Sequence, residues 1–217
     1  MGIPFFRKID RQFCIVDFVP VRAVLFAGRN GADTNSINAL LCKAYIDVYM
    51  GLTYEVLAAV NYDDESAKFT VIYKYDDVSL KIRANDVESS VIIVDGDSLN
   101  DRFEAKENLI EDHYQSVELI KSREISSIDH HRNMYYPDEV SALYINEFGH
   151  IESLWIKVDM YIVERGDGKH VLCGRLYSEP FENCGYHRND MAIITVDVGE
   201  ERTCPFVESI TTTNFNL

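Results

Sequence analysis

The chain has 217 residues, of which 47% are apolar and 12% aromatic, and this composition excludes an intrinsically disordered protein. Its formal net charge is −15, and because surplus carboxylates repel phosphate groups, we expect neither nucleic acid nor a membrane surface as a partner. No apolar run approaches the ~20 residues of a membrane-spanning helix, and the start of the chain has no export signal. The five cysteines are scattered and lack the spacing of a disulfide framework. Together with the absence of an export signal, this predicts a cytoplasmic protein.

The negative charge is unevenly distributed along the chain. Residues 1–60 carry six basic and five acidic side chains, whereas residues 61–130 carry eight basic and seventeen acidic ones. Residues 131–217 carry seven and fourteen, so almost all of the surplus follows residue 60. Such a distribution favours attraction of a basic protein partner, and the alternative is that the charge only keeps the protein in solution.

The first sixty residues are predicted to form two strands and a helix. Residues 12–18 and 21–27 are rich in β-branched and aromatic side chains and are separated by a proline, so we expect two strands. A capping residue, Asp33 or Thr34, then precedes apolar residues at three- and four-residue spacing, and Gly51 follows them as at the end of a helix. These apolar residues are Ile37, Leu40, Leu41, Ala44, Tyr45 and Val48.

Four further strands and a second helix complete the first half of the chain. The strands are expected at residues 54–60, 68–75, 78–83 and 90–94. A turn at residues 95–98 then precedes the helix, whose polar face is mostly acidic. Its apolar stripe consists of Phe103, Ile110, Tyr114 and Val117. The first half is therefore predicted to be an antiparallel sheet with two helices.

The second half is predicted to contain strands alone. They are expected at residues 139–146, 154–163, 171–177 and 192–198, with Trp155 in the core. Strands at this spacing indicate a small β barrel or a strongly bent sheet. The whole chain is thus predicted to be α+β, with an α+β domain at residues 1–127 and a small all-β domain at residues 131–217. A single core shared by the two halves is the alternative.

Residues 136–198 contain a series of short motifs. A charged segment at 138–143 is followed by W-I-K-V at 155–158, G-R-L-Y-S-E-P at 174–180 and N-D at 189–190. This series resembles a group of bacterial β domains of unknown function, whose pattern is M-W-V-x-V, then G-x-L-x-N-x-P, then G-D-x-V. Ser178 stands where these domains usually have Asn, and Asn189 where they usually have Gly. The resemblance implies an accessory or immunity-like module without catalytic residues, and the first half resembles no family.

Two groups of side chains are candidates for a metal-assisted hydrolase. His170 and Cys173 together with Cys184 and His187 have the short spacings of zinc ligands. The first pair, however, begins a predicted strand, in which residues three apart point to opposite faces, so we expect no metal and no cofactor. The remaining chelate would be Cys184 with His187.

The second group is the pair His130 and His131, which follows Asp129 in a predicted connector. Histidine can serve as a general base or a metal ligand near neutral pH. No nucleophile motif accompanies this pair, so the sequence favours a protein that is not an enzyme.

The sequence therefore predicts a non-catalytic, cytoplasmic, immunity-like binding or inhibitor protein whose acidic surface binds a basic protein partner. The expected contact residues lie in an acidic turn and on the polar face of the second helix. They are Asp63, Asp64, Glu65, Glu104, Glu107 and Glu111. The alternatives are the metal-assisted hydrolase and a structural accessory subunit.

Overall fold

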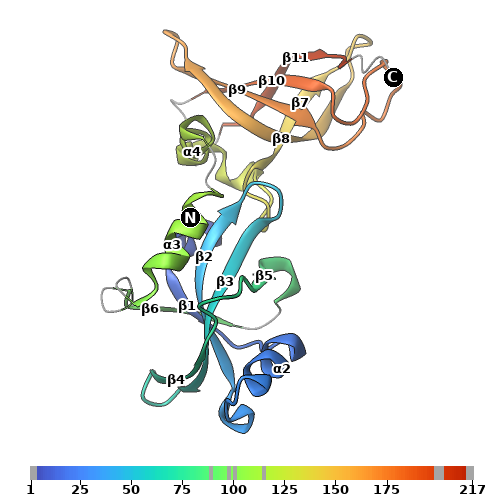
Figure 1. Cartoon of the computed structure of the whole chain (residues 1–217). Helices are drawn as coiled ribbons and strands as arrows, with labels where there is room; N and C mark the ends of the chain where they lie inside the picture. Colours follow the sequence, from blue (N-terminus) through green and yellow to red (C-terminus); the bar gives the residue numbers. More distant parts are fainter. Residues whose placement is uncertain are drawn as a thin grey trace. The chain divides into compact units, whose positions relative to one another are not determined.

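A computed structural model describes residues 4–87, 90–96, 99, 102–113, 116–197 and 203–213, without the side chains of Ala105 and Glu107 (Figure 1). The chain divides into two compact units, Met1–Tyr114 and Gln115–Leu217. Both are rich in strands, and the predicted α+β class is confirmed. No helix in the described part of the chain is long and apolar enough to cross a membrane.

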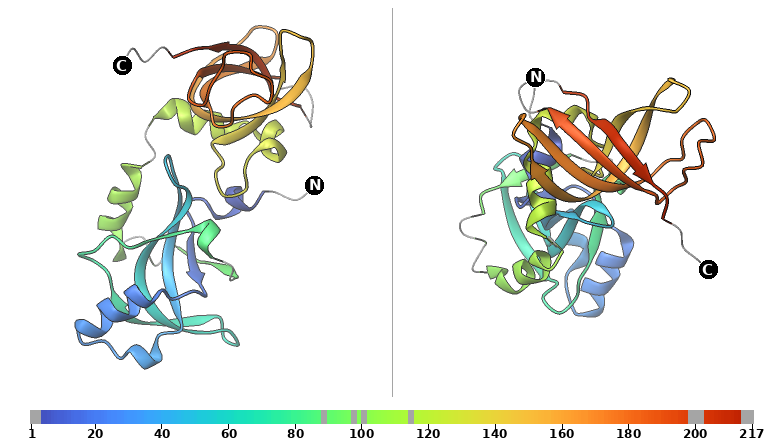
Figure 2. Two further views of the ribbon diagram at one scale, coloured as in Figure 1. Left: turned by 90° about the vertical axis from the view of Figure 1, so that its right-hand side faces the viewer. Right: turned by 90° about the horizontal axis from the view of Figure 1, so that it is seen from above.

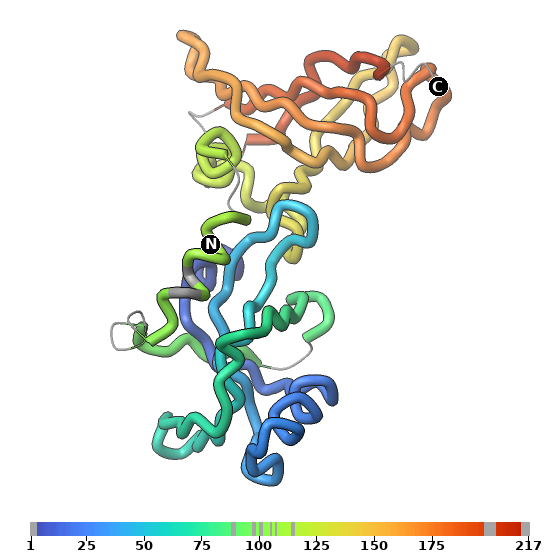
Figure 3. Tube along the Cα trace, in the orientation of Figure 1, coloured from blue at the N-terminus to red at the C-terminus, as the bar shows by residue number. Residues whose placement is uncertain are grey.

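The first unit is built on an antiparallel sheet with the strand order β4-β3-β2-β1-β6, and β5 pairs with the beginning of β3 (Figure 1). Its strands are β1 (Phe13–Val16), β2 (Ala39–Asp47), β3 (Gly51–Asp63), β4 (Lys68–Lys74), β5 (Lys81–Arg83) and β6 (Val91–Val94). Its helices are α1 (Phe5–Ile9), α2 (Val21–Arg29) and α3 (Glu104–Glu111), with short 3₁₀ turns at Thr34–Ser36 and Ala84–Asp86. The tube in Figure 3 traces the long hairpin that β2 and β3 form.

The helix predicted after residue 33 is wrong, because these residues form the central strand β2. Every residue of β2 except Lys43 is buried, since the strand is paired on both sides and covered on both faces. A strand buried on both faces is apolar at nearly every position, so it also satisfies the three- and four-residue spacing of a helix. Gly51 does not end a helix; with φ of 70° it begins β3 after the hairpin turn.

The strand predicted at residues 21–27 is also wrong, because α2 occupies this segment. Pro20 directly precedes the first helical residue, where its missing N–H costs no hydrogen bond within the helix. Ala23 and Ala27, four residues apart, are buried, while Val21 and Leu25 are exposed. The pattern is therefore helical, with small side chains toward the protein.

The single helix predicted from Phe103 to Val117 is two helices in the structure. The first is α3, and the second is α4 (Val117–Glu124), which belongs to the second unit. Ser116 caps α4, and its hydroxyl accepts a hydrogen bond from the Leu119 N–H. A serine at this position is a strong signal for a helix start.

The second unit contains α4, a 3₁₀ segment at Ser126–His131 and five strands whose pairings return to the first strand. The strands are β7 (Glu139–Ile145), β8 (Ile151–Glu164), β9 (Lys169–Leu176), β10 (Met191–Asp197) and β11 (Phe206–Thr211). They pair in chain order, and β11 then runs parallel to β7, with Phe206 opposite Leu143. The left view of Figure 2 shows these strands curling round on one another. The strand β11 was not predicted.

Side chains inside this ring of strands form the core of the second unit. Leu154, Ile156 and Val158 of β8 are buried, so the residues between them point outward. Trp155 is therefore not a core residue, and 37% of its surface is exposed. On β10, regular alternation places Ala192, Ile194 and Val196 in the core. The prediction that Trp155 lies in the core was thus wrong.

Two buried arginines hold α4 and the 3₁₀ segment against the strands. Arg123 of α4 donates two hydrogen bonds, of 2.8 and 2.7 Å, to the carboxylate of Asp138, the residue before β7. Arg132 donates to the carbonyl oxygens of Ser122 and Pro137, at 2.6 and 2.7 Å. Bidentate guanidinium–carboxylate pairs are strong and directional. α4 is therefore part of the second unit, and the division of the chain falls ahead of the boundary predicted near residue 127.

We expect a fragment of residues 115–217 to unfold in one cooperative transition. A fragment of residues 131–217 lacks Leu119, which is fully buried, and loses Arg123 as the partner of Asp138. It should be less stable by about 2 kcal/mol or more, the contribution of one buried leucine side chain. Urea unfolding followed by near-UV dichroism measures both fragments, and equal stabilities would contradict this account.

Candidate functional site

The acidic residues predicted to bind a partner lie on two elements of the first unit. Asp63, Asp64 and Glu65 form the exposed turn between β3 and β4. The carboxylate of Asp63 accepts hydrogen bonds from the Ser66 hydroxyl, at 2.6 Å, and from the Glu65 N–H, at 3.1 Å. The hydrogen bond from Ser66, and then that from Glu65, lower the pKa of Asp63. The carboxylate therefore remains charged and shapes the turn.

The other predicted contacts lie on α3. Glu104 and Glu111 are exposed, as expected, and the Glu107 side chain lies outside the described residues. The side chains of Lys106 and Ile110 are buried, so α3 has one face toward the sheet and an acidic face toward solvent. Glu111 also lies 3.6 Å from the guanidinium of Arg11.

The orientation of α3 depends on a buried ion pair that the sequence did not reveal. Lys106 of α3 is 6% exposed, and its Nζ lies 3.7 Å from Oε1 of Glu55, a residue of β3 with no solvent exposure. Lys106 also donates a 2.5 Å hydrogen bond to the Val78 carbonyl oxygen. The Ser79 hydroxyl donates to the other oxygen of Glu55, at 3.2 Å. Burial raises the pKa of Glu55 despite the hydrogen bond from Ser79 and the charge of Lys106.

A second buried carboxylate, Asp47 at the end of β2, lies in the same sheet. Its Oδ2 is 3.6 Å from Arg83 Nη1 and 3.9 Å from both Lys81 Nζ and His113 Nδ1. Its Oδ1 accepts hydrogen bonds from two N–H groups of the β2–β3 turn. Lys81 Nζ lies 3.0 Å from His113 Nε2, so this group also connects the sheet to the residues after α3.

This network of buried charges supports the fold and does not present a reactive group. Asp47 is 4% exposed and Glu55 has no exposure, so neither carboxylate can touch a substrate. Each is surrounded by cations that α3 and β5 supply, an arrangement that fixes these elements relative to the sheet. The exposed acidic face of α3 is the part of this assembly that a partner can reach.

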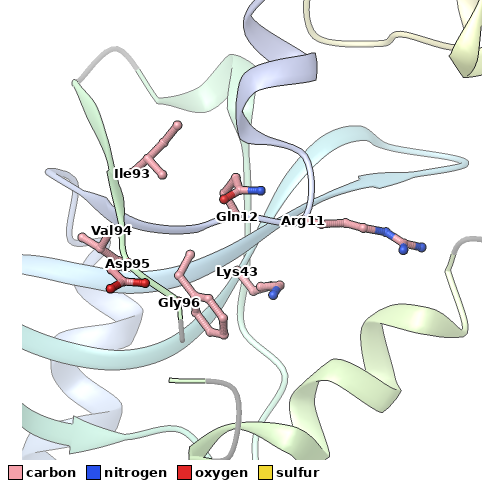
Figure 4. A pocket seen from close by; sticks show the side chains of 8 residues that line it. Arg11, Gln12, Lys43, Ile93, Val94, Asp95 and Gly96 are labelled. Carbon is pink, nitrogen blue, oxygen red and sulfur yellow. The ribbon is translucent and has the colours of Figure 1, made fainter. Parts of the chain in front are cut away.

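A shallow pocket lies beside β1 and β6 in the same unit (Figure 4). Its volume is about 440 Å³, and its polar lining includes Arg11, Lys43 and Asp95. Lys43 Nζ lies 3.9 Å from the centre of the Phe13 ring, a cation–π contact. Gly96 is needed here, because a Cβ would come within 2.8 Å of that ring. Two cations beside one carboxylate do not define a particular ligand.

A second pocket, of about 400 Å³, lies in the second unit between α4 and the strands β8 and β9. It includes His170, one of the predicted metal-ligand candidates, whose Nδ1 lies 2.9 Å from the Tyr161 hydroxyl. Burial raises the pKa of Tyr161, so this hydroxyl is protonated at neutral pH. His170 is thus engaged by a tyrosine of the neighbouring strand.

The other metal-ligand candidates are not brought together with His170. Cys173 is buried in β9, and burial raises the pKa of its thiol, which disfavours the thiolate that binds metal. His187 lies 3.7 Å from Glu179, and Cys184 is in the same loop. Within the described residues, no three or more His, Cys, Asp or Glu side chains are grouped so that they could hold a metal ion. The four-residue cluster of the alternative hydrolase therefore has no support among the described residues.

The histidine pair is in the 3₁₀ segment of the second unit and not in a loose connector. The rings of His130 and His131 lie 4.3 Å apart. Burial, and then the neighbouring His130, lower the pKa of His131, so its ring is neutral at neutral pH. Asp129 pairs with the buried Arg132, at 3.4 Å, and so supports the fold.

No protein-family model matches this chain, and no curated protein or solved structure matches it. The resemblance of residues 136–198 to bacterial β domains therefore remains a prediction.

We expect the buried pair in the first unit to show strong coupling. Glu55→Leu leaves the charge of Lys106 buried without its partner, and Lys106→Met does the same to Glu55, so each should destabilise by about 3–5 kcal/mol. The double variant Glu55→Leu/Lys106→Met removes both charges and should cost much less than the sum. Urea unfolding of the four proteins measures the coupling, and additive losses would show that the two side chains do not interact.

Proposed function

We propose that this protein is a non-catalytic, cytoplasmic binding or inhibitor protein of the immunity type, which binds a basic protein partner. The observation that carries the proposal is the acidic face of α3, held toward solvent by the buried pair of Lys106 and Glu55. A rigid acidic face attracts a basic partner over long range and needs little ordering when the partner arrives. The five cysteines are all free, which agrees with a reducing compartment.

In this proposal the second unit is a small β barrel of the kind that the motifs resemble. Gly174 is required, because a Cβ there would lie 2.3 Å from the Lys157 carbonyl oxygen on β8. Asn189 has a φ of 75°, a conformation in which the glycine usual at this place is most easily accommodated. Asp190 accepts hydrogen bonds from the N–H groups of His187 and Thr213, at 2.8 and 2.9 Å. The motif residues therefore have structural roles, which agrees with a module that lacks catalytic residues.

The metal-assisted hydrolase is the weaker candidate. His170 is hydrogen-bonded to Tyr161. The thiol of Cys173 on the same strand is buried, and burial raises its pKa. No observation favours the structural accessory subunit over the binding protein.

The test begins with capture of the partner from the native host at low salt and its identification after elution with salt. Association rates of the purified pair are then measured at ionic strengths of ~0.01 and ~0.15 M, where the Debye lengths are ~30 and ~8 Å. We expect a basic partner whose association slows steeply with salt. An acidic partner, or a rate indifferent to salt, would contradict the proposal.

Charge reversal locates the surface. Glu104→Lys/Glu111→Lys should slow association ~10-fold or more at low salt, because steering depends on the charge near the contact. The control Asp17→Lys/Asp86→Lys makes the same change of net charge at exposed positions on other elements of the first unit. If the two double variants slow association equally, overall charge is responsible and α3 is not the contact.

A further inference from the structure

Cys14 of β1 and Cys42 of β2 lie directly opposite each other in the sheet of the first unit. Residues opposite each other in an antiparallel pair have their side chains on the same face, with Cβ atoms ~4.5–5.5 Å apart. The Sγ atom of Cys14 lies 3.8 Å from the carbonyl oxygen of Cys42, so its thiol is turned toward the partner residue. The fold therefore brings together two thiols that are far apart in the sequence.

The backbone spacing at this pair suits a disulfide. The Ala44 N–H donates a 2.9 Å hydrogen bond to the Gln12 carbonyl oxygen. Because hydrogen-bonded and non-hydrogen-bonded pairs alternate along an antiparallel ladder, Cys14 and Cys42 form the next hydrogen-bonded pair. The Cα atoms of such a pair are ~5.5 Å apart, within the ~4.4–6.8 Å that a disulfide spans. Its preferred Cβ spacing of ~3.5–4.5 Å is reached by moving β1 toward β2 by ~1 Å.

The other three cysteines have different surroundings. Cys173 lies opposite Ile193 of β10 and Met160 of β8. Cys184 is partly exposed in the loop after β9, and Cys204 is exposed in the segment before β11. The direct pairing of two cysteines across neighbouring strands is therefore a feature of the first unit.

Both thiols of the pair are protected while the sheet is closed. Neither Cys14 nor Cys42 has any solvent exposure. Burial raises the pKa of the Cys14 thiol, and burial, followed by the neighbouring Cys14 and Glu55, raises that of Cys42. Since the thiolate is the form that attacks a disulfide, the pair cannot react in the closed sheet. Reaction requires a local opening that hydrates both residues.

The helix α2 covers this face of the sheet and is held there weakly. Burial, and then Tyr73 and Cys42, raise the pKa of Tyr75, which places Tyr75 near the thiols. The Tyr75 hydroxyl donates a 2.9 Å hydrogen bond to the carbonyl oxygen of Ala23 in α2. The buried residues of α2 are two alanines, so its detachment exposes little apolar area.

The strand β1 directly precedes α2 in the chain and can open with it. It is four residues long and lies between β2 and the edge strand β6. The neighbouring strand β2, in contrast, is paired with β3 along its whole length. Short elements near the edge of a sheet open at a lower free energy than its centre. Opening of β1 and α2 therefore exposes both cysteines and leaves β2 in place.

We propose that Cys14 and Cys42 form a redox site, which closes to an intramolecular disulfide when β1 and α2 open in the presence of a disulfide oxidant such as oxidised glutathione. The bridge would join β1 to β2 and close residues 14–42, which include α2, into a covalent loop. This inference concerns the first unit alone and does not rest on the proposed binding partner.

The reaction is a pair of thiol–disulfide exchanges. The thiolate of one cysteine attacks a sulfur of oxidised glutathione, forms a mixed disulfide and releases one glutathione thiolate. The thiolate of the second cysteine then attacks the protein sulfur of the mixed disulfide and releases the other glutathione thiolate. The two protons lost by the cysteines are taken up by the two glutathiones. The protein is oxidised and the glutathione disulfide is reduced.

The test equilibrates the full-length protein with oxidised and reduced glutathione. Urea is added to the low concentration at which iodoacetamide labels Cys14 and Cys42 in a parallel sample, because this labelling shows that both thiols become exposed. The reaction is stopped with acid, free thiols are alkylated and the protein is digested with trypsin. Each of the five cysteines lies on a different tryptic peptide, and those of Cys14 and Cys42 span residues 12–22 and 30–43. Mass spectrometry therefore assigns each crosslink directly.

We expect the crosslink between the peptides 12–22 and 30–43 to exceed every other protein crosslink by ~10-fold or more, because the fold holds these two thiols together. Dithiothreitol should reverse it. The matched reference is the same reaction in concentrated urea. In the unfolded chain, loop closure favours the pairs closest in sequence, which are Cys173 with Cys184 and Cys184 with Cys204.

Two variants serve as controls. Cys184→Ser/Cys204→Ser removes the two more accessible thiols and should leave the crosslink between Cys14 and Cys42 unchanged. Cys14→Ala should leave Cys42 as a mixed disulfide with glutathione. If Cys14→Ala does not fold, the crosslinks of the unaltered protein still decide the question.

Three results would overturn the inference. The first is that Cys14 and Cys42 each carry glutathione without joining. The second is that their crosslink has the same share of all crosslinks at low urea as in the unfolded chain. The third is that the crosslink joins two chains, which electrophoresis without reducing agent shows as a dimer.

Discussion

The buried ion pair between Glu55 and Lys106 is the constraint on which the first unit depends. A carboxylate without solvent exposure in the middle of β3 requires a cation, and α3 supplies it. The helix must therefore lie with Lys106 toward the sheet, and its acidic residues must point to water. Because desolvation makes the pair a poor source of net stability, its main effect is to specify which face of α3 is exposed.

Local sequence patterns predicted the polar face of α3 correctly but misassigned the fully buried strand β2, the helix α2 and the position of Trp155. The acidic exposure of Glu104 and Glu111 was predicted correctly, because α3 has a clear division between polar and apolar faces. The strand β2 was taken for a helix, because a strand apolar at almost every position fits either period. Trp155 was placed in the core because of its size, although its position between Leu154 and Ile156 in an alternating strand puts it outside.

The structural features described above arise from contacts between residues far apart in the sequence. No local motif predicts such contacts. Glu55 meets Lys106 because β3 and α3 fold together, and nothing near either residue indicates the other. Likewise, Phe206 lies opposite Leu143 only through the pairing of β11 with β7. Short motifs such as those at Gly174 and Asn189 identify tight packing and turns, so they predict the fold of the second unit better than its binding surface.

The parallel contact between β11 and β7 has a consequence for how the second unit folds and opens. Successive strands of the second unit run in opposite directions, so with five strands the last has the same direction as the first. The strands β11 and β7 are therefore parallel where they pair. Beside this pairing, the Leu143 N–H donates a 2.8 Å hydrogen bond to the Pro205 carbonyl oxygen. This seam joins the segments most distant in sequence, whereas the other pairs are local hairpins that close at low entropic cost. The seam should therefore form last and open first. Leu143 and Phe206 lie on the two strands of this seam. A ligand that binds both side chains would therefore hold the seam closed and slow the unfolding of the unit.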